Sequence, residues 1–457
     1  MSALASLMAS EGHQVLGSDG DVYPPVSTYL ERLGIPFFRG FEASHVPDDL
    51  DLAIVGSSAA LDLEHNPELA ALAAKGVRRQ SFAEHLGEYS ATRETCVVAG
   101  SFGKSTLTAM LAVMMRAAGR DPGYFIGAVP LDLPTTGHAG ADPELLLEGD
   151  EYVVDAKNRR SKFLLYHPRL LLLSSLVHDH LNVFPTMASY EAPFAELIAR
   201  LPADALVVAS RDHEPIRRLA AGRPVTWYGL GEGPGYSATD VEIGEITRFA
   251  LRTPAGRTWP LETELLGLHN IENIVGASAL LLEWGVLRPD QLAAGVRAFR
   301  GVARRLDKKT RASAVPAYEG FGSSYEKARS AIEAIALHFP HRRLVVVFEP
   351  HTFSWRSEAA LSWYDTVFEG VAEVLVLPPP AHGAITHRQL SLAEIVARVG
   401  AAGVAANAAA SADAAMAELE RRLQGDEVVL LLSSGPLYGL VERVPAWLET
   451  KFGRSGR

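Results

Sequence analysis

The feature that most constrains the fold of this chain is the alternation of short apolar runs with longer amphipathic segments along its whole length. Runs rich in Leu, Val and Ile are typical of strands buried in a parallel sheet, and the intervening segments are typical of helices that cover such a sheet. The sequence therefore predicts an α/β fold. The predicted strands are Gln14–Gly17, Leu52–Val55, Thr95–Ala99, Leu170–Val177, Ala205–Ala209, Arg343–Phe348, Glu373–Leu377 and Glu427–Leu432, and the predicted helices include Met1–Ser10, Lys104–Ala118, Ile271–Trp284 and Tyr325–Ala336.

The length of the chain and its polar segments indicate several domains. At about 150 residues per domain, a chain of 457 residues allows roughly three domains. The polar segment Glu88–Glu94 precedes a predicted strand and suggests a boundary near residue 90. The basic run Arg304–Arg311 suggests a second boundary near residue 310, although charge alone is equally typical of a solvated linker. We expect the Ala-rich tract Ala401–Ala417 to form helix surface.

Composition excludes several classes of protein. With 43 Lys and Arg against 54 Asp and Glu, the formal net charge of −11 argues against a nucleic-acid partner held through its phosphates. The single cysteine, Cys96, excludes an internal disulfide framework, and we expect a buried, inert thiol. No apolar stretch reaches the ~18 residues of a membrane span. We therefore predict a cytoplasmic protein without a membrane partner, and the oligomeric state stays open.

The most informative segment is a phosphate-binding loop between a predicted strand and a predicted helix. An apolar strand runs into Gly100, and Gly-Lys-Ser-Thr opens the following helix at Lys104. Such a turn directs backbone N–H groups at a phosphate chain, while the lysine reaches terminal oxygens and the Ser105 hydroxyl holds Mg²⁺. Val98 stands where the common motif has its first glycine. A chance Gly-Lys-Ser is the alternative, which the flanking strand and helix disfavour.

This loop resembles that of the Mur ligases, the ATP-dependent amide ligases of peptidoglycan synthesis. The loop of that family has a glycine, two residues and then Gly-Lys-Thr/Ser-Thr, as this chain has from Gly100 to Thr106. Further segments resemble the murein peptide ligases, which join the tripeptide L-Ala-γ-D-Glu-meso-diaminopimelate to UDP-N-acetylmuramate. These segments are Gly17–Thr28, Phe125–Pro130, Leu147–Tyr152, Arg160–Phe163, Gly267–Asn270, Gly301–Arg305 and Phe348–Pro350.

The resemblance implies an architecture and a reaction. It implies a Rossmann-like nucleotide-sugar domain over residues 1–90, a central P-loop ATPase domain over 91–308 and a Rossmann-like ligase domain over 309–457. In the implied reaction, ATP phosphorylates the muramate carboxylate with the help of Mg²⁺. The amine of a peptide or amino acid then attacks the activated carbonyl, and phosphate leaves. Such catalysis is mostly positioning and charge neutralisation.

The resemblance also implies a role for individual residues. ATP would lie on Gly100, Ser101, Phe102, Gly103, Lys104, Ser105 and Thr106, with Asn270 at the adenine and Arg305 at the γ-phosphate. Glu148 and His180 would hold a second cation, beside the one on Ser105. Asp19, His351 and Arg356 would contact substrate, and the planar guanidinium of Arg356 suits a carboxylate. The catalytic set is therefore Lys104, Glu148, His180 and Arg305.

Three of these residues also have simpler explanations. Glu148 could belong to an acidic surface over Glu144–Glu151, and His180 to a polar loop over His178–His180. Arg305 could be one more linker charge.

The chain departs from the family pattern at the start of the third predicted domain. The acid expected to hold the ATP ribose falls on Gly320, so that Glu319 is the carboxylate left to reach the ribose. Two expected histidines are Ser323 and Ser324. Elsewhere, Asn182 and Val153 replace expected acids.

The first residues also differ from the family, because the chain starts after the first strand and Gly-rich turn. A three-layer domain without its first strand would expose two sheet edges, so either the true start lies upstream or the domain has lost nucleotide-sugar binding. We expect the former.

Two classes of function compete on this evidence. The leading hypothesis is an ATP- and Mg²⁺-dependent ligase that joins a peptide or amino acid to a UDP-N-acetylmuramate-type nucleotide sugar. The muramate–L-alanine ligase is the nearest enzymatic alternative. The changes at Gly320, Ser323 and Ser324 favour a non-catalytic paralogue that binds a ligand or a partner, or a ligase redirected to another carboxylate.

Overall fold

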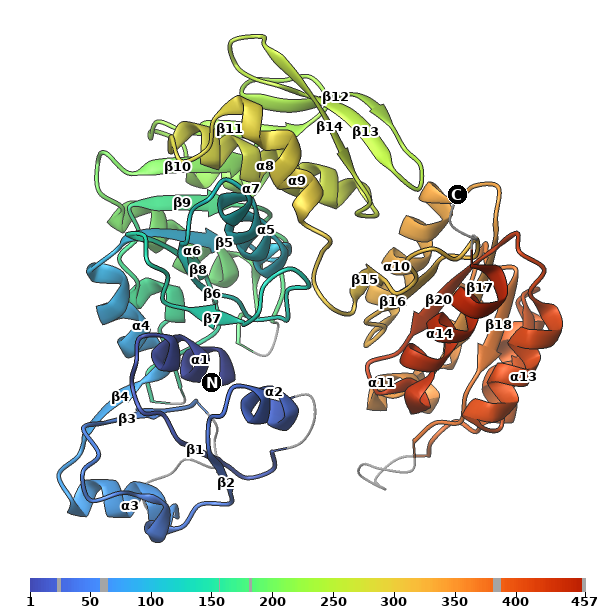
Figure 1. Cartoon of the computed structure of the whole chain (residues 1–457), viewed down its shortest axis with the longest axis horizontal. Helices are drawn as coiled ribbons and strands as arrows, with labels where there is room; N and C mark the ends of the chain where they lie inside the picture. Colours follow the sequence, from blue (N-terminus) through green and yellow to red (C-terminus); the bar gives the residue numbers. More distant parts are fainter. Residues whose placement is uncertain (23–25, 58–64, 156, 181–182, 381–387, 454–457) are drawn as a thin grey trace. The chain divides into compact units, whose positions relative to one another are not determined.

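The computed structural model describes residues 1–22, 26–57, 65–155, 157–180, 183–380 and 388–453. The chain forms two compact units. The first comprises Met1–Val241, Arg248–Glu262 and Ile271–Phe299, and the second comprises Glu242–Thr247, Thr263–Asn270 and Arg300–Arg457. Each unit combines helices with a mainly parallel sheet, which confirms the predicted α/β class (Figure 1).

A ten-stranded sheet organises the first unit, in the order β14-β13-β12-β11-β10-β9-β5-β8-β6-β7. Its strands are β5 (Glu94–Ala99), β6 (Gly123–Phe125), β7 (Gly137–His138), β8 (Glu144–Glu148), β9 (Leu170–Leu173), β10 (Leu206–Ser210), β11 (Thr226–Leu230), β12 (Tyr236–Glu242), β13 (Thr247–Arg252) and β14 (Thr258–Thr263). Strand β5 is parallel to both of its neighbours, β8 and β9. The loop that follows β5 therefore emerges at the centre of the carboxyl edge.

Helices cover both faces of this sheet. Val97 and Ala99 of β5 pack with α1 (Ser2–Ser10), α4 and α6 in one core. Cys96 and Val98 alternate with them and are equally buried toward the opposite face. The helical elements are α4 (Phe82–Ala91), α5 (Lys104–Ala117), η2 (Lys162–Leu165), α6 (Met187–Arg200), α7 (Glu214–Leu219), α8 (Leu268–Glu283), η3 (Pro289–Gln291) and α9 (Leu292–Ala298).

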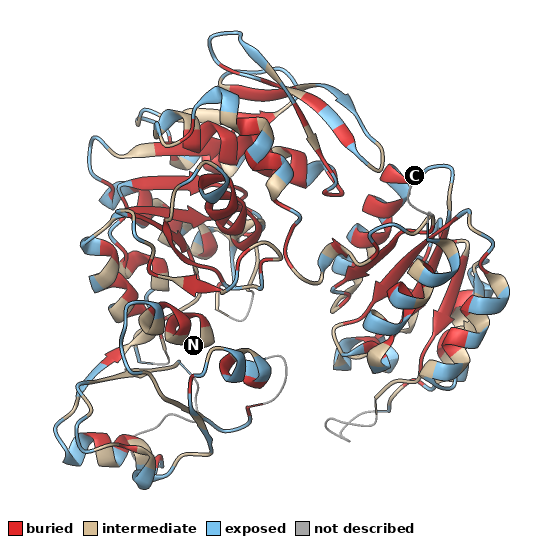
Figure 2. Cartoon of the chain, viewed as in Figure 1, coloured by how far each residue is buried: buried red, intermediate tan, exposed pale blue. Residues whose placement is uncertain are grey.

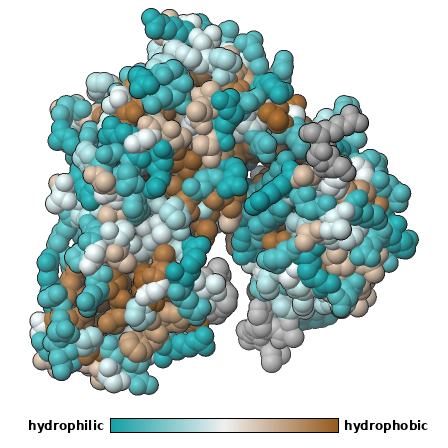
Figure 3. Space-filling view, viewed as in Figure 1, coloured by the Kyte–Doolittle hydropathy of each residue, from teal (hydrophilic) through white to brown (hydrophobic). Residues whose placement is uncertain are grey.

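The N-terminal segment forms two small parallel pairs of strands. Strand β1 (Gly17–Asp19) pairs with β2 (Phe37–Arg39), and β3 (Leu52–Val55) pairs with β4 (Arg78–Ser81). In the described residues the two pairs do not join into one sheet. Strand β3 is apolar but only half buried, and Figure 3 shows apolar residues reaching the surface over this segment. Its helical elements are α1 (Ser2–Ser10), α2 (Val26–Arg32), η1 (Ala43–His45) and α3 (Pro67–Ala74).

The second unit has a six-stranded sheet in the order β15-β16-β20-β17-β18-β19. Strand β15 is antiparallel to β16 and the other pairings are parallel. The strands are β15 (Arg305–Lys308), β16 (Ala317–Gly320), β17 (Arg343–Phe348), β18 (Glu373–Val376), β19 (Ala405–Ala408) and β20 (Glu427–Leu432). Figure 2 shows that the central strands are buried, as expected for a sheet covered on both faces.

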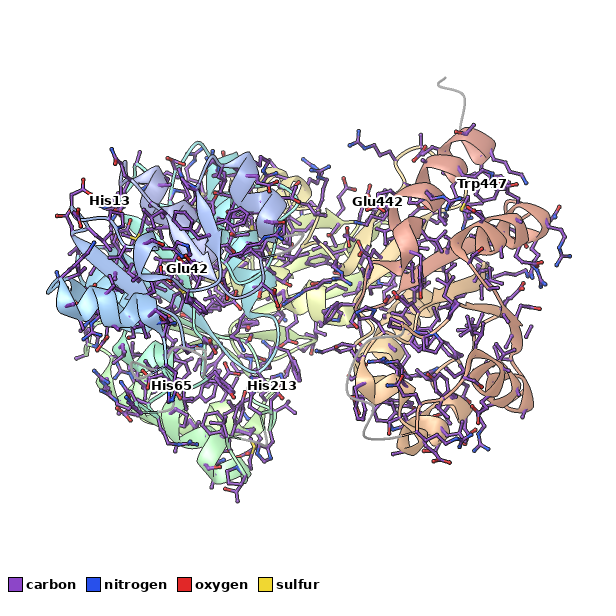
Figure 4. The ribbon with its side chains drawn as sticks, turned by 90° about the horizontal axis from the view of Figure 1, so that it is seen from below. His13, Glu42, His65, His213, Glu442 and Trp447 are labelled. Atoms are coloured by element: carbon purple, nitrogen blue, oxygen red, sulfur yellow. The ribbon has the colours of Figure 1, made fainter. Side chains whose placement is uncertain are left out.

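Two separate cores lie on the two faces of this second sheet. One joins it to α10, η4 and α12, and the other to α13 and α14. Glu442 and Trp447 project from α14 (Figure 4). The helical elements are α10 (Tyr325–His338), α11 (Phe353–Arg356), η4 (Glu358–Asp365), α12 (Leu392–Ala401), α13 (Ala412–Arg422), η5 (Leu437–Gly439) and α14 (Leu440–Phe452).

Some predicted elements are wrong in extent or type. Strand β1 begins at Gly17, where the predicted strand ends. Strand β9 ends at Leu173 rather than Val177, because the next residues bind the loop after β5. The Ala-rich tract contains the edge strand β19 as well as helix. The basic run after Arg304 includes strand β15 and is more than a solvated linker.

No helix in the described part of the chain is both long enough and apolar enough to cross a bilayer.

Candidate functional site

Two glycines with positive φ shape the loop between β5 and α5. Gly100 has φ +141°, and a Cβ added there would lie 2.8 Å from the Ser175 carbonyl oxygen. Gly103 has φ +84° and precedes the helix. The first intrahelical bond runs from Leu107 N to Gly103 O at 2.8 Å. The N–H groups of the first turn therefore have no acceptor within the helix and suit a phosphate anion.

Serine hydroxyls at the end of β9 fix the loop. The Ser175 hydroxyl accepts from Phe102 N at 2.9 Å, and the Ser174 hydroxyl donates to Phe102 O at 2.6 Å. Ser101 Oγ donates to Val177 O and accepts from Val177 N, each at 2.7 Å. The Phe102 side chain itself is 56% exposed. The loop backbone is thus held from one side by the chain that follows β9.

Lys104 turns its ammonium back toward the loop. Its Nζ donates to Gly100 O at 2.6 Å and lies 3.3 Å from Ser101 O. The Glu151 carboxylate lies 2.9 Å from the same nitrogen and is 0% exposed. A lysine at this position reaches phosphate oxygens in P-loops, and here its charge is already paired with a buried acid.

Ser105 and Glu148, which the family resemblance assigns to two different cations, meet at the carboxyl edge of the sheet. The Ser105 hydroxyl donates to Glu148 Oε1 at 2.8 Å, while Gly127 N donates to Glu148 Oε2 at 2.7 Å. A hydroxyl and a carboxylate oxygen are the hard ligands that Mg²⁺ prefers. Among the described residues no cluster of three or more His, Cys, Asp or Glu side chains forms a complete metal site. Mg²⁺ usually keeps several waters and binds substrate phosphates, so this two-residue donor set fits it.

His180 follows β9 in a left-handed conformation and contacts a different acid. Its φ is +54°, and its Nε2 lies 3.4 Å from Glu151 Oε1. The ring also packs edge-on against Tyr152, with centroids 5.3 Å apart. Its side chain is 38% exposed. The structure therefore links His180 to Glu151, whereas Glu148 bonds to Ser105 and Gly127.

Thr106 is buried in the first turn of α5.

Cys96 is an inert packing residue, as expected. It is fully buried in β5, and burial raises the pKa of its thiol.

Asn270 lies in the second unit, in the first turn of α8. It is buried, and its side-chain nitrogen donates to Leu266 O at 2.8 Å. The preceding Gly267 has φ +89° and donates its N–H to His338 Nε2 at 2.7 Å. Asn270 is therefore attached to a backbone turn that His338 holds.

Glu319 of β16 is buried in an ionic network. Its carboxylate lies 2.7 Å from Lys309 Nζ and 3.2 Å from Arg304 Nε. Lys309 also pairs with the buried Asp307 at 2.7 Å, and burial raises the pKa of that carboxyl. Arg305 begins β15 with an exposed side chain. A ribose bound by Glu319 would thus share the carboxylate with two cations.

Position 320 faces the apolar side of the sheet. A Cβ there would meet Leu432 Cδ1 at 3.2 Å and Leu430 Cδ1 at 3.3 Å. The neighbouring serines have structural partners, because Ser324 caps α10 through Lys327 N and Ser323 Oγ accepts from Lys327 Nζ. A carboxylate side chain at position 320 would therefore enter a hydrophobic layer.

His351 and Arg356 follow β17 but differ in exposure. His351 Nδ1 lies 3.1 Å from Glu349, a buried acid that also accepts from Ser433 Oγ at 2.7 Å. Arg356 is 3% exposed and donates to Pro380 O at 2.9 Å. Its guanidinium thus binds backbone of its own chain.

Three further positions singled out from the sequence lie apart from these contacts or outside the described residues. Asp19 is exposed at the end of β1, and its Oδ1 accepts from Gly20 N at 2.8 Å. Asn182 lies outside the described residues. Val153 forms an isolated bridge with Ser161.

Two residues beside the loop lysine were not predicted from the sequence. Glu151 lies three positions after Glu148 and was visible in the acidic segment, but no local pattern distinguishes it. Tyr190 of α6 is fully buried, and its hydroxyl lies 3.2 Å from Glu151 and 3.0 Å from Ser101. Nothing in the surrounding sequence indicates that this tyrosine reaches the loop.

Comparison with known proteins gives consistent matches. Residues 98–281 match the family model described as "Mur ligase middle domain", and residues 1–94 match "Mur ligase family, catalytic domain". The UDP-N-acetylmuramate–L-alanine ligase of Roseiflexus sp. (strain RS-1) is 30% identical over 386 residues, covering 80% of each chain. The UDP-N-acetylmuramate–L-alanyl-gamma-D-glutamyl-meso-2,6-diaminoheptandioate ligase of Escherichia coli (strain K12) is 28% identical over 77% of each chain.

The solved structures agree on the fold. The UDP-N-acetylmuramate-alanine ligase of Thermotoga maritima superposes with a TM-score of 0.77 at 21% identity, covering 99% of this chain and 97% of that one.

Proposed function

This chain belongs to the Mur ligase family, and from that premise we propose that it is an ATP- and Mg²⁺-dependent ligase that joins an amine to the carboxylate of a UDP-N-acetylmuramate-type substrate. The observation that carries the proposal is the loop after β5, where Lys104, the Ser105–Glu148 pair and the N-terminus of α5 converge. We further propose the three-domain division at about residues 90 and 308 for this chain.

The first role of the site is to hold the phosphates. The N–H groups of the first turn of α5 and the ammonium of Lys104 provide positive charge where a terminal phosphate would transfer. The Gly103 turn lets the backbone approach closely, since its φ of +84° is unfavourable for other residues. Binding of this kind stabilises charge that spreads over the transferring group.

The second role is to hold the divalent cation. Ser105 Oγ and Glu148 would supply oxygen ligands, and His180 would supply a nitrogen if its ring turned from Glu151. Mg²⁺ bound there would screen the negative charges of the carboxylate and the phosphate that approach one another. Glu148 is already oriented by Gly127 N, which fixes the carboxylate that the ion would meet.

The second unit supplies the remaining proposed contacts. We assign Asn270 to the adenine and Arg305 to the γ-phosphate. Of the two residues after β17, His351 is the better candidate for a substrate contact, because Arg356 is buried and bonded to the backbone. Arg356 would instead stiffen the turn that presents His351.

The identity of the amine needs a direct comparison. The sequence segments favour the tripeptide L-Ala-γ-D-Glu-meso-diaminopimelate, whereas L-alanine is the alternative named for the Roseiflexus relative. Phosphate release should be measured with ATP, Mg²⁺ and UDP-N-acetylmuramate, adding each amine separately. The proposal predicts release only when all components are present and loss of release in Lys104→Ala. The matched control is Lys451→Ala, which removes a surface lysine that bonds to Glu420 O. Release by Lys104→Ala at the wild-type rate would refute the proposal.

A second candidate function is supported by the surroundings of β16. Because Gly320 faces leucines and Glu319 is paired with two cations, a non-catalytic paralogue that binds a ligand without turnover is also consistent with the structure. Absence of phosphate release with every amine, combined with tight binding of the nucleotide sugar, would favour this candidate.

A further inference from the structure

Glu151 is a buried acid at which three side chains of the candidate site meet. Its carboxylate is 0% exposed, yet it lies 2.9 Å from Lys104 Nζ, 3.2 Å from the Tyr190 hydroxyl and 3.4 Å from His180 Nε2. A carboxylate without contact to water needs compensation of this kind to remain charged. Glu151 therefore has both a partner of opposite charge and a neutral donor.

The single hydroxyl proton of Ser101 fixes the direction of its contact with Tyr190. Ser101 has one hydroxyl proton, which it donates to Val177 O at 2.7 Å. The single proton of the Tyr190 hydroxyl is then shared between two acceptors, Ser101 Oγ at 3.0 Å and Glu151 Oε1 at 3.2 Å. Burial raises the pKa of this phenol, so it keeps its proton. Tyr190 thus orients Glu151 and the loop serine from one hydroxyl.

The partners of Lys104 account for its three N–H donors. They are Gly100 O, Ser101 O and the Glu151 carboxylate. Since the ammonium has only three protons, contact with a phosphate oxygen requires it to leave at least one of these partners. Of the three partners, the Glu151 carboxylate competes most strongly with a phosphate for the ammonium, because both are anions.

We propose that Glu151, held by Tyr190, is a positioning residue that sets both the orientation of Lys104 and the net positive charge that the loop offers to a polyphosphate. This inference rests on the proposed function. Glu151 would hold the ammonium at the loop mouth, ready for the transferring phosphate, and would weaken the resting affinity of the loop for anions. Binding and turnover should therefore respond in opposite directions when its charge is removed.

The decisive variant is Glu151→Gln, which keeps the shape of the side chain. We expect the dissociation constant for the β,γ-imido analogue of ATP with Mg²⁺, and that for inorganic triphosphate, to fall by about threefold to tenfold, the scale of one charge–charge interaction screened by water. We expect kcat to fall because the lysine loses its orientation. A merely structural role would instead weaken binding and lower kcat together.

Two further variants complete the test. Asp150→Asn is the matched control, because Asp150 pairs with Lys162 at 2.7 Å, and it should bind as the wild type does. Glu151→Asp keeps the charge, so we expect its dissociation constant within about twofold of the wild type and its kcat at least about threefold lower.

The outcomes separate the inference from the proposed function. If the wild type fails to bind the analogue, the proposed function is wrong. If the wild type binds and a folded Glu151→Gln binds equally or more weakly, the inference is wrong. If Glu151→Gln loses its cooperative melting transition, Glu151→Asp alone decides. The expected dissociation constant and kcat of Glu151→Asp together support the inference, and any other combination of the two overturns it.

Discussion

The hydroxyl of Ser105 donates a hydrogen bond of 2.8 Å to the carboxylate of Glu148, which joins the first turn of α5 to the end of β8. The two residues are 43 positions apart, and the parallel pairing of β5 with β8 brings them together. We expect Ser105→Ala and Glu148→Gln each to raise the Mg²⁺ concentration for half-maximal phosphate release by about tenfold, because the first removes an oxygen ligand and the second removes the negative charge and one carboxylate oxygen.

A Mg²⁺ titration of phosphate release tests this expectation, with Asp150→Asn as the control that changes a neighbouring carboxylate. An unchanged Mg²⁺ requirement in both variants would show that the cation is bound elsewhere.

Gly100→Ala should disrupt the loop through contact with the chain after β9. The added methyl group would lie 2.8 and 2.9 Å from the backbone oxygen and nitrogen of Ser175, so the backbone must shift. We expect a loss of about 2–3 kcal/mol in the free energy of unfolding, measured by urea titration, and loss of nucleotide binding. Gly119→Ala is the control. Its φ is also positive at +84°, but no atom lies within 4 Å of the added Cβ, so we expect the free energy of unfolding to fall by only about 1 kcal/mol. Equal effects would contradict the steric account.

His338 should make the second unit less stable at low pH. Its Nδ1 lies 2.8 Å from Gly244 O and therefore carries the proton, while Nε2 accepts from Gly267 N at 2.7 Å. Burial lowers the pKa of His338, and burial followed by the charge of His338 lowers that of His269. The folded state thus binds fewer protons than the unfolded chain, so stability is retained at neutral pH and decreases as the pH falls below about 6.5.

The slope of stability against pH can be measured from the midpoints of urea unfolding at several pH values between about 8 and 5. His338→Gln should reduce this pH dependence and leave the contribution of His269. A variant with the full slope of the wild type would assign the pH dependence to groups other than His338.

Gly320→Asp should fail to restore the acid expected by family resemblance. The new carboxylate would enter the layer of Leu430 and Leu432, where it would lose its hydration. We expect a decrease of about 3 kcal/mol or more in the free energy of unfolding and no gain in nucleotide affinity. Gly320→Ala, with a smaller group, should be milder. Tighter nucleotide binding by a stable Gly320→Asp would show that this strand edge can rearrange.

Local patterns predicted the central elements of the fold and the loop. Strand β5, the glycines and α5 are contiguous in sequence, so turn chemistry and helix-forming residues define them without tertiary information. Strands β17 and β20 were predicted with their observed bounds, since both are continuous apolar runs buried on two faces.

Features that depend on distant partners could not be predicted. Tyr190 meets Ser101 across 89 positions, and Glu151 meets Lys104 across 47. The small residues of β19 favour helix locally, and only pairing with β18 makes them a strand. Ser174 and Ser175, after β9, were predicted as strand. Their hydrogen bonds to Phe102 are tertiary contacts, which local sequence does not indicate.

The most direct test of the central claim is an isothermal titration of the purified protein with the β,γ-imido analogue of ATP, with and without Mg²⁺. The account predicts saturable binding of one nucleotide per chain that strengthens with Mg²⁺ and is lost in Lys104→Ala. Absence of binding in the wild type, or equal binding in Lys104→Ala, would contradict it.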